Sequence, residues 1–132
     1  MTASKNLRNV DDDEFFVFLT KKAIEKIHFF DKILVFENGL DSINYLKENI
    51  ETQDLFPQII LLDLSMPIMD GWQFLDQFNL LAPEIKKKLE IYVVSSSISP
   101  EDIKTVKSFS AVSDFIVKPI SMDKLLEMIK TL

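Results

Sequence analysis

The stretch that decides the fold is Ile59-Ile60-Leu61-Leu62-Asp63. Four bulky apolar residues run without a break into a carboxylate, and Ser65-Met66-Pro67 and Asp70-Gly71 follow closely. A short apolar run that ends at a turn is typical of a strand buried on both faces, as in a parallel sheet. Open α/β sheets bind their ligands at the carboxyl ends of such strands. The stretch therefore predicts a buried strand with Asp63 at the functional edge of a sheet.

Strand-like and helix-like segments alternate along the chain. The expected strands are residues 6–10, 33–36, 59–62, 91–94 and 115–117. Helices are expected over 13–28, after Asn38-Gly39, through 72–78, from Ser99 and from about Ser121, because apolar residues recur there at helical spacing or a capping signal begins the segment. This alternation predicts an α/β fold, a doubly wound parallel sheet with helices on both faces and right-handed crossovers.

The first expected strand fits this pattern poorly. It consists of Asn6-Leu7-Arg8-Asn9-Val10, whereas a central parallel strand should be strongly apolar. Burying Arg8 and Asn9 without partners would be costly. Two possibilities stay open: the strand is short and frayed, or its polar side chains find partners that the sequence does not reveal.

Length and composition limit the possible functions. The 132 residues suit a single domain, 1–132, in which 1–5 are expected to form a flexible N-terminal tail. A net charge of −6 argues against nucleic-acid binding. No apolar stretch approaches the ~20 residues that span a bilayer, and the N-terminus has no apolar core typical of a secretory signal. The absence of cysteine excludes disulfides and fits a cytoplasmic protein.

Chemically useful residues follow several of the expected strands. They are Asp11-Asp12-Asp13, Asp63, Ser95 and Lys118-Pro119. In a parallel sheet these positions converge on one edge. The crowded carboxylates suit a hard divalent cation such as Mg²⁺, whereas a chain with one histidine, His28, and no cysteine argues against zinc. An aspartate can attack phosphorus to form an acyl phosphate, and lysine and serine are suitable partners for phosphoryl oxygens.

At these residues the sequence resembles the receiver domain of two-component response regulators. The resemblance covers nearly the whole chain. The stand-alone, single-domain type is expected, because the chain ends at Leu132 directly after the last expected helix. The resemblance implies a flavodoxin-like five-stranded parallel sheet in the order 2-1-3-4-5 with five helices. The motifs that carry it are Val10-Asp11-Asp12, Leu62-Asp63-Leu64-Ser65-Met66-Pro67, Met69-Asp70-Gly71, Val94-Ser95-Ser96 and Val117-Lys118-Pro119.

The resemblance also implies roles for individual residues. Asp63 would accept a phosphoryl group from a phosphohistidine on a sensor histidine kinase or phosphotransfer protein. Asp12, Asp63 and the backbone carbonyl of Ser65 would bind Mg²⁺ directly, and Asp11 would act through bound water. Lys118 would pair with the phosphoryl oxygens, and its bond to the following proline is a candidate for the cis form. The chain would thus be a phosphoacceptor and not an enzyme that turns over a substrate.

Three consecutive aspartates leave the register of the acidic pair open. The pair could be Asp11 and Asp12, or Asp12 and Asp13. The first choice is preferred because Asp11 and Asp12 directly follow Val10, and Asp13 is well placed to cap the helix that follows.

Signalling in the family uses a two-state switch. The hydroxyl of Ser95 would move toward the phosphoryl group, and the ring of Phe115 would fill the space that it leaves. Many members have tyrosine at this position, and phenylalanine lacks its hydroxyl. The output face would comprise the fourth helix, the fifth strand and the last helix, and would bind an unknown downstream protein. The protein is expected to be a monomer or a weak dimer.

Other functions remain possible. A degenerate receiver could act as a binding scaffold without phosphorylation. A small phosphohydrolase of the haloacid-dehalogenase type would need a second aspartate two residues after the nucleophile, where this chain has Ser65. Flavin binding has little support, because no loop rich in serine and threonine follows the first strand.

Overall fold

The computed structural model describes residues 5–51, 56–81, 83, 89–96 and 99–132. In this part of the chain, five strands form one parallel sheet in the order β2-β1-β3-β4-β5. This confirms the doubly wound fold and the strand order. The strands are β1 (Asn6–Val10), β2 (Lys32–Phe36), β3 (Ile59–Leu62), β4 (Glu90–Ser95) and β5 (Val112–Val117).

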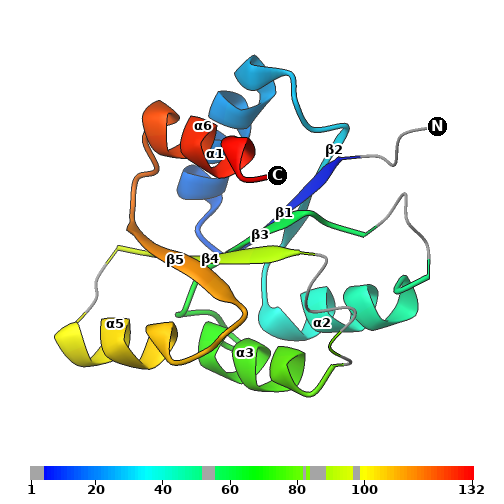
Figure 1. Cartoon of the computed structure of the whole chain (residues 1–132), viewed down its shortest axis with the longest axis vertical. Helices are drawn as coiled ribbons and strands as arrows, with labels where there is room; N and C mark the ends of the chain where they lie inside the picture. Colours follow the sequence, from blue (N-terminus) through cyan, green and yellow to red (C-terminus); the bar gives the residue numbers. More distant parts are fainter. Residues whose placement is uncertain (1–4, 52–55, 82, 84–88, 97–98) are drawn as a thin grey trace.

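Helices cover both faces of the sheet. Figure 1 shows α1 and α6 on one face and α2, α3 and α5 on the other. Their bounds are α1 (Glu14–Ile27), α2 (Gly39–Glu48), α3 (Gly71–Asn79), α5 (Pro100–Lys107) and α6 (Met122–Lys130). Each begins after a polar residue whose side chain accepts a hydrogen bond from a free N–H of the first turn: Asp13, Asn38, Asp70, Ser99 and Ser121. Among the described residues, no helix is long and apolar enough to cross a bilayer.

Strand β3 joins the two hydrophobic cores. Ile60 and Leu62 belong to the core beneath α2, α3 and α5, whereas Ile59 and Leu61 belong to the core beneath α1 and α6. All four side chains are buried, with at most 1% of their surface exposed. A strand with helices on both faces has no solvated side, so its sequence is an unbroken apolar run.

The polar strand β1 is buried along its whole length and pairs with both β2 and β3. The hypothesis of a short, frayed strand is therefore wrong. The guanidinium carbon of Arg8 lies 4.8 Å from the ring centroid of Tyr45 and 5.6 Å from that of Phe36. Burial lowers the pKa of Arg8 to about 10, which leaves it charged at neutral pH. Aromatic rings from α2 and β2 thus supply cation–π contacts for this buried charge.

Strand β5 begins three residues earlier than predicted, at Val112 instead of Phe115. Ser113 and Asp114 interrupt the apolar pattern, so the sequence did not reveal this part of the strand. β5 lies at the edge of the sheet, where polar side chains can reach solvent. The carboxylate of Asp114 also pairs with the ammonium of Lys124 on α6 at 2.8 Å.

The expected N-terminal tail falls mostly outside the described residues, which start at Lys5. Lys5 itself is held in place. Its backbone N–H donates to the carboxylate of Asp31 at 2.7 Å, and its ammonium lies 4.3 Å from the ring centroid of Phe29.

Candidate functional site

Strand ends bring the candidate residues to one edge of the sheet. Asp11 follows β1, Asp63 follows β3, Lys118 follows β5, and Ser95 is the last residue of β4. Backbone hydrogen bonds extend the sheet past these ends. The N–H of Asp63 donates to the carbonyl of Val10, and the N–H of Lys118 donates to that of Ser95, both at 2.9 Å. The sheet itself therefore sets the relative positions of these side chains.

Carboxylates gather at this edge. Asp11, Asp12 and Asp63 each contribute an oxygen to a group whose members all lie within 4.8 Å of one another. Asp11 and Asp63 are buried, and Asp12 is exposed. Asp13 instead caps α1, because its side chain accepts a hydrogen bond from the N–H of Phe16 at 3.1 Å. The structure thus groups Asp11 and Asp12 with Asp63, whereas Asp13 caps α1 and its Oδ2 lies 3.9 Å from Nζ of Lys118.

Lys118 extends its ammonium into this acidic cluster. Its Nζ lies 2.8 Å from Oδ2 of Asp11 and 3.8 Å from Oδ1 of Asp63. Only 10% of the Lys118 side chain is exposed. The ring of Phe16 also faces the ammonium, with its centroid 4.4 Å from Nζ. The peptide bond between Lys118 and Pro119 is cis, as the resemblance implies.

Burial makes the negative charge at this site costly. The pKa of Asp63 is raised to about 6, chiefly by desolvation and also by the charge of Asp11, while Lys118 acts in the opposite direction. Desolvation also raises the pKa of Asp11, against the opposing effect of its hydrogen bond with Lys118. Lys118 carries one positive charge, whereas the cluster can carry three negative charges. A further cation would relieve the imbalance.

The donor set fits a hard divalent cation. Mg²⁺ binds carboxylate and carbonyl oxygens and keeps several of its waters. Within the described residues, Asp11, Asp12 and Asp63 are the one group of three acidic or histidine side chains that come together in this way. Because Asp12 is exposed while the other two are buried, the group opens toward solvent on one side.

The loop after Asp63 is packed tightly against the site. The N–H of Gly71 donates to the carbonyl of Leu64 at 3.0 Å. A Cβ atom on Gly71 would lie 2.4 Å from the carbonyl oxygen of Asp63 and 2.7 Å from the Cα of Leu64, so no side chain fits there. Asp70 and Gln73 form a reciprocal capping box at the start of α3. Hydrogen bonds therefore fix the loop between Asp63 and α3 near its beginning, at Leu64, and at its end, at Asp70 and Gly71.

Ile68 has an unusual backbone conformation in this loop. Its φ is 67°, which β-branched residues rarely adopt. The N–H of Met69 donates to the carbonyl of Pro67 at 2.7 Å, which makes a γ-turn centred on Ile68. The carbonyl of Met69 in turn accepts a hydrogen bond from the N–H of Gly39 at 2.8 Å. The turn thereby links the loop after Asp63 to the start of α2.

Ser95 lines an open pocket beside Asp63. The pocket has a volume of about 330 Å³, and its walls are Leu64, Ser65, Met66, Asp70, Trp72, Ser95 and Asp102. Phe115 is half-buried two residues before the end of β5 and packs against the core beneath α2, α3 and α5. The structure thus places Ser95 at the site and Phe115 on the neighbouring strand, behind it.

Phe16, Trp72 and Asp102 lie at the site although the sequence did not indicate it. The sequence predicts only that all three belong to helices, because their spacing or capping position is typical of a helix. Phe16 contacts Lys118, and Trp72 and Asp102 line the pocket with Ser95, because of how α1, α3 and α5 pack on the sheet. No local signal could have revealed it.

The fold and the site together define a class of α/β domains with an acidic cluster and a lysine at one edge of a parallel sheet. Comparison with known proteins narrows this class. Residues 9–130 match the family model of the response regulator receiver domain. The chain therefore belongs to the receiver domain family of two-component systems, for which phosphorylation and Mg²⁺ are typical.

Individual relatives agree with this assignment. The chain is 29% identical over 119 residues to the chemotaxis protein CheY of Listeria monocytogenes, covering 90% of this chain and 91% of that protein. A two-component response regulator from Cytophaga hutchinsonii has a TM-score of 0.88 at 26% identity, covering 98% and 97%. The Mn²⁺-bound form of response regulator Rcp1 has a TM-score of 0.72 at 22% identity, covering 96% and 90%, and shares the fold.

Proposed function

We propose that Asp63 accepts a phosphoryl group from a phosphohistidine on a sensor histidine kinase or a phosphotransfer protein, and that this modification controls binding of a downstream protein. The observation that carries the proposal is the buried carboxylate of Asp63 beside both the acidic pair and Lys118. Membership of the receiver family supports it.

Mg²⁺ would be the cofactor. Asp12, Asp63 and the backbone carbonyl of Ser65 would hold it directly, and Asp11 would act through bound water. When bound, the ion would offset the charge of the carboxylates and of the phosphoryl oxygens. The uncompensated charge of the acidic cluster supports this role, and the Mn²⁺-bound structure of Rcp1 shows that a protein of the same fold binds a divalent cation.

The residues of the chain would then carry out the transfer. With a pKa of about 6, Asp63 is mostly ionised at neutral pH and can act as a nucleophile. A bond forms between its carboxylate oxygen and phosphorus while the phosphorus–nitrogen bond of the donor breaks, and the imidazole leaves. Lys118 would pair with one phosphoryl oxygen, and the hydroxyl of Ser95 would donate to another.

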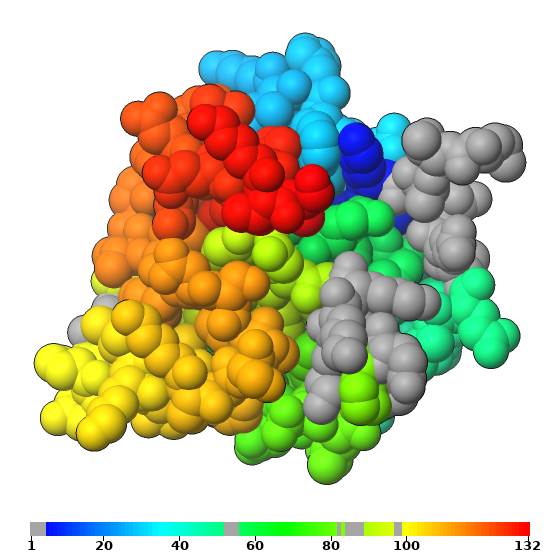
Figure 2. All heavy atoms as spheres, in the orientation of Figure 1, coloured from blue at the N-terminus to red at the C-terminus, as the bar shows by residue number. Residues whose placement is uncertain are grey.

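The output face would consist of α5, β5 and α6. Figure 2 shows these segments, from yellow to red, side by side on one surface of the molecule. Apolar side chains are exposed there, including Val117 at 55% and Leu126 at 41%. Ser95 would move toward the phosphoryl group and Phe115 would follow it inward. Phosphorylation shifts the equilibrium between the inactive and active arrangements of Ser95 and Phe115 only to the extent that the phosphoryl group interacts more favourably with one of them.

The mass of the intact protein after incubation with Mg²⁺ and acetyl phosphate tests the proposal. We expect the addition of one phosphoryl group that requires Mg²⁺ and is absent from Asp63→Asn. If neither a phosphoryl adduct nor Mg²⁺ binding were detected, the phosphorylation-independent scaffold would be the better hypothesis. Steady hydrolysis of a small phosphoester would instead indicate a phosphohydrolase.

Neighbouring aspartates provide a matched control for the metal site. Asp12→Asn removes a carboxylate from the acidic cluster, whereas Asp13→Asn makes the same change one residue later and keeps a side chain that can cap α1. We expect Asp12→Asn to lose most of the Mg²⁺-dependent phosphorylation and Asp13→Asn to retain it. Loss of phosphorylation in both variants would instead favour Asp12 and Asp13 as the acidic pair.

A further inference from the structure

The ammonium of Lys118 has two different kinds of neighbour. One is a set of carboxylates: Asp11 at 2.8 Å, with Asp63 and Asp13 farther away at 3.8 and 3.9 Å. The other is the aromatic ring of Phe16, whose centroid lies 4.4 Å from Nζ. This distance is well inside the range at which a ring attracts a cation. Because the Lys118 side chain is only 10% exposed, the attraction is stronger than at a surface site.

Phe16 is held firmly in the place from which it contacts Lys118. Its backbone N–H donates to the capping carboxylate of Asp13 at 3.1 Å, which sets the first turn of α1. Its side chain is 6% exposed and belongs to the core beneath α1 and α6. The position of the ring is thus determined by the helix start and by the core, and does not depend on Lys118.

Lys118 must change partners if it is to hold a phosphoryl group on Asp63. Its closest contact is with Asp11, so the ammonium has to weaken that ion pair as it turns to the new oxygens. A carboxylate would compete with phosphoryl oxygens for the N–H donors of the ammonium. An aromatic face attracts the cation without accepting a directed hydrogen bond, and can therefore stabilise it in both positions.

We propose that Phe16 is a positioning residue that holds the ammonium of Lys118 at the phosphorylation site through a cation–π contact. This inference rests on the proposed phosphoacceptor function of Asp63. In this role the electron-rich face of the Phe16 ring matters, and an apolar side chain of similar size could not replace it. The competing explanation is that Phe16 only fills space in the core, in which case the electronic character of the ring has no influence on Lys118.

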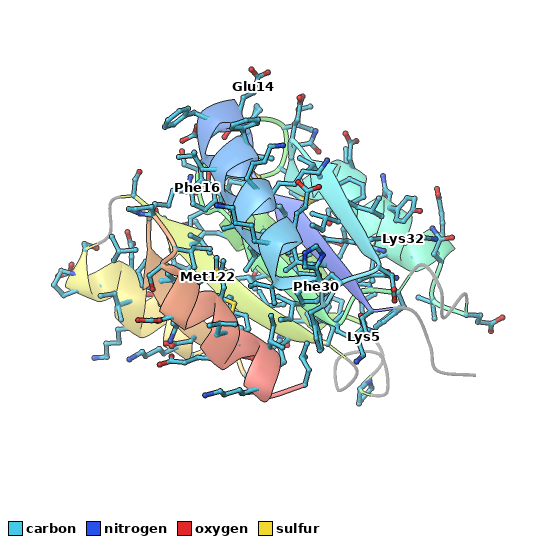
Figure 3. The ribbon with its side chains drawn as sticks, turned by 90° about the horizontal axis from the view of Figure 1, so that it is seen from above. Lys5, Glu14, Phe16, Phe30, Lys32 and Met122 are labelled. Carbon is cyan, nitrogen blue, oxygen red and sulfur yellow. The ribbon has the colours of Figure 1, made fainter. Side chains whose placement is uncertain are left out.

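Fluorination of the ring separates the two explanations. Fluorine withdraws electron density from the π face and changes the size of the ring little. Phe16 is replaced by mono-, di- and trifluorinated phenylalanine, and the same series at Phe30 serves as the matched control. Phe30 packs against the same core, and Figure 3 shows Phe16 in the first turns of α1 and Phe30 beyond the other end of that helix.

The initial rate of phosphorylation by acetyl phosphate and Mg²⁺ is measured for each variant. We expect a stepwise fall along the Phe16 series, by about tenfold in total, and no trend along the Phe30 series. Phe16→Leu should be as slow as the most fluorinated variant, and Phe16→Tyr should keep most of the rate because it keeps the ring face. Equal rates throughout the Phe16 series, or the same trend at Phe30, would overturn the proposal.

Nuclear magnetic resonance tests the contact without any phosphodonor. The ε-methylene protons of Lys118 should be shifted upfield by the ring of Phe16 and should return toward their usual position in Phe16→Leu. Unshifted protons in the unsubstituted protein would overturn the inference about Phe16. Shifted protons in a protein that acetyl phosphate does not modify would instead establish the contact and contradict the proposed function of Asp63.

Discussion

At the scale of single residues, the burial of charged carboxylates at the sheet edge determines the energetic cost of the site. Asp63 is 6% exposed and Asp11 is 2% exposed, yet both must be ionised for the proposed chemistry. Burial disfavours the charged form of each carboxyl group, and Lys118 compensates only in part. The site is therefore destabilising until a cation joins it.

Removing the charge of Asp63 should stabilise the fold. The pKa of Asp63 is about 6 in the folded protein and ~3.9 in an unfolded chain. The folded state therefore holds the proton more tightly, and the stability that this gives is full below about pH 4 and is lost as the pH rises through about 6. Asp63→Asn cannot ionise, so at about pH 8 its free energy of unfolding should exceed that of the unsubstituted protein by up to about 3 kcal/mol.

Urea denaturation with a chelator present measures this difference. The advantage of Asp63→Asn should shrink as the pH falls and should vanish near pH ~4. A difference that stays the same across this range would mean that the titration of Asp63 is not its cause.

Gly71 should not tolerate even a methyl group. Its Cβ atom would meet the carbonyl oxygen of Asp63 at 2.4 Å, and backbone atoms cannot swing aside as a flexible side chain can. Gly71→Ala should lower the free energy of unfolding by about 2–3 kcal/mol and should weaken Mg²⁺ binding, because the backbone that carries Asp63 must shift. Gly39→Ala, whose closest approach is 2.8 Å, should cost less in urea denaturation. Equal costs would contradict this ranking.

At the scale of elements, the loop between β3 and α3 stores backbone strain next to the candidate site. Ile68 adopts a φ of 67° while 74% of its side chain is exposed, so packing contributes little to offset the unfavourable backbone. The γ-turn at Ile68 nevertheless directs the carbonyl of Met69 to the N–H of Gly39. The strained turn thus connects the loop that follows Asp63 with the start of α2.

Glycine at position 68 should therefore be stabilising. A residue with a Cβ atom loses about 1–2 kcal/mol at positive φ, whereas the extra freedom of glycine in the unfolded chain costs about 0.5–1 kcal/mol. We expect Ile68→Gly to raise the free energy of unfolding by about 0.5–1 kcal/mol. Leu80→Gly is the control, because Leu80 is 79% exposed and has a φ of −82°. Thermal or urea denaturation that destabilised both variants equally would contradict the strain at Ile68.

At the scale of the whole molecule, the acidic edge links cation binding to stability. Its carboxylates come from the ends of β1 and β3, neighbouring strands at the centre of the sheet. A ligand that binds only the folded state stabilises it in proportion to the logarithm of its concentration. Mg²⁺ should thus stabilise the entire fold and not only the loops around Asp63.

The melting temperature should rise with Mg²⁺ and fall again when a chelator is added. At a concentration about a hundredfold above the dissociation constant, the gain should be ~2.7 kcal/mol. Asp12→Asn should lose most of this gain, whereas Asp13→Asn should keep it. An equal rise in both variants in differential scanning calorimetry would show that Mg²⁺ acts elsewhere on the protein.

The sequence by itself determined the fold class and the edge at which the candidate residues lie. The run Ile59–Leu62 marks a strand buried on both faces, and Asp63 must then emerge at its carboxyl end. Periodicity shows the alternation of strands and helices but not the order of strands in the sheet, which came from the family resemblance. Helix starts were also readable, because caps such as Asp13 and Ser99 act through bonds to nearby residues.

Tertiary structure decided what depends on distant neighbours. Arg8 is accommodated in β1 because rings from β2 and α2 lie beside it, and β5 tolerates polar residues because it is an edge strand. The contact between Phe16 and Lys118 joins the first helix to the end of the last strand. Such contacts arise from the packing of whole helices and strands, and the spacing of residues along the chain does not predict them.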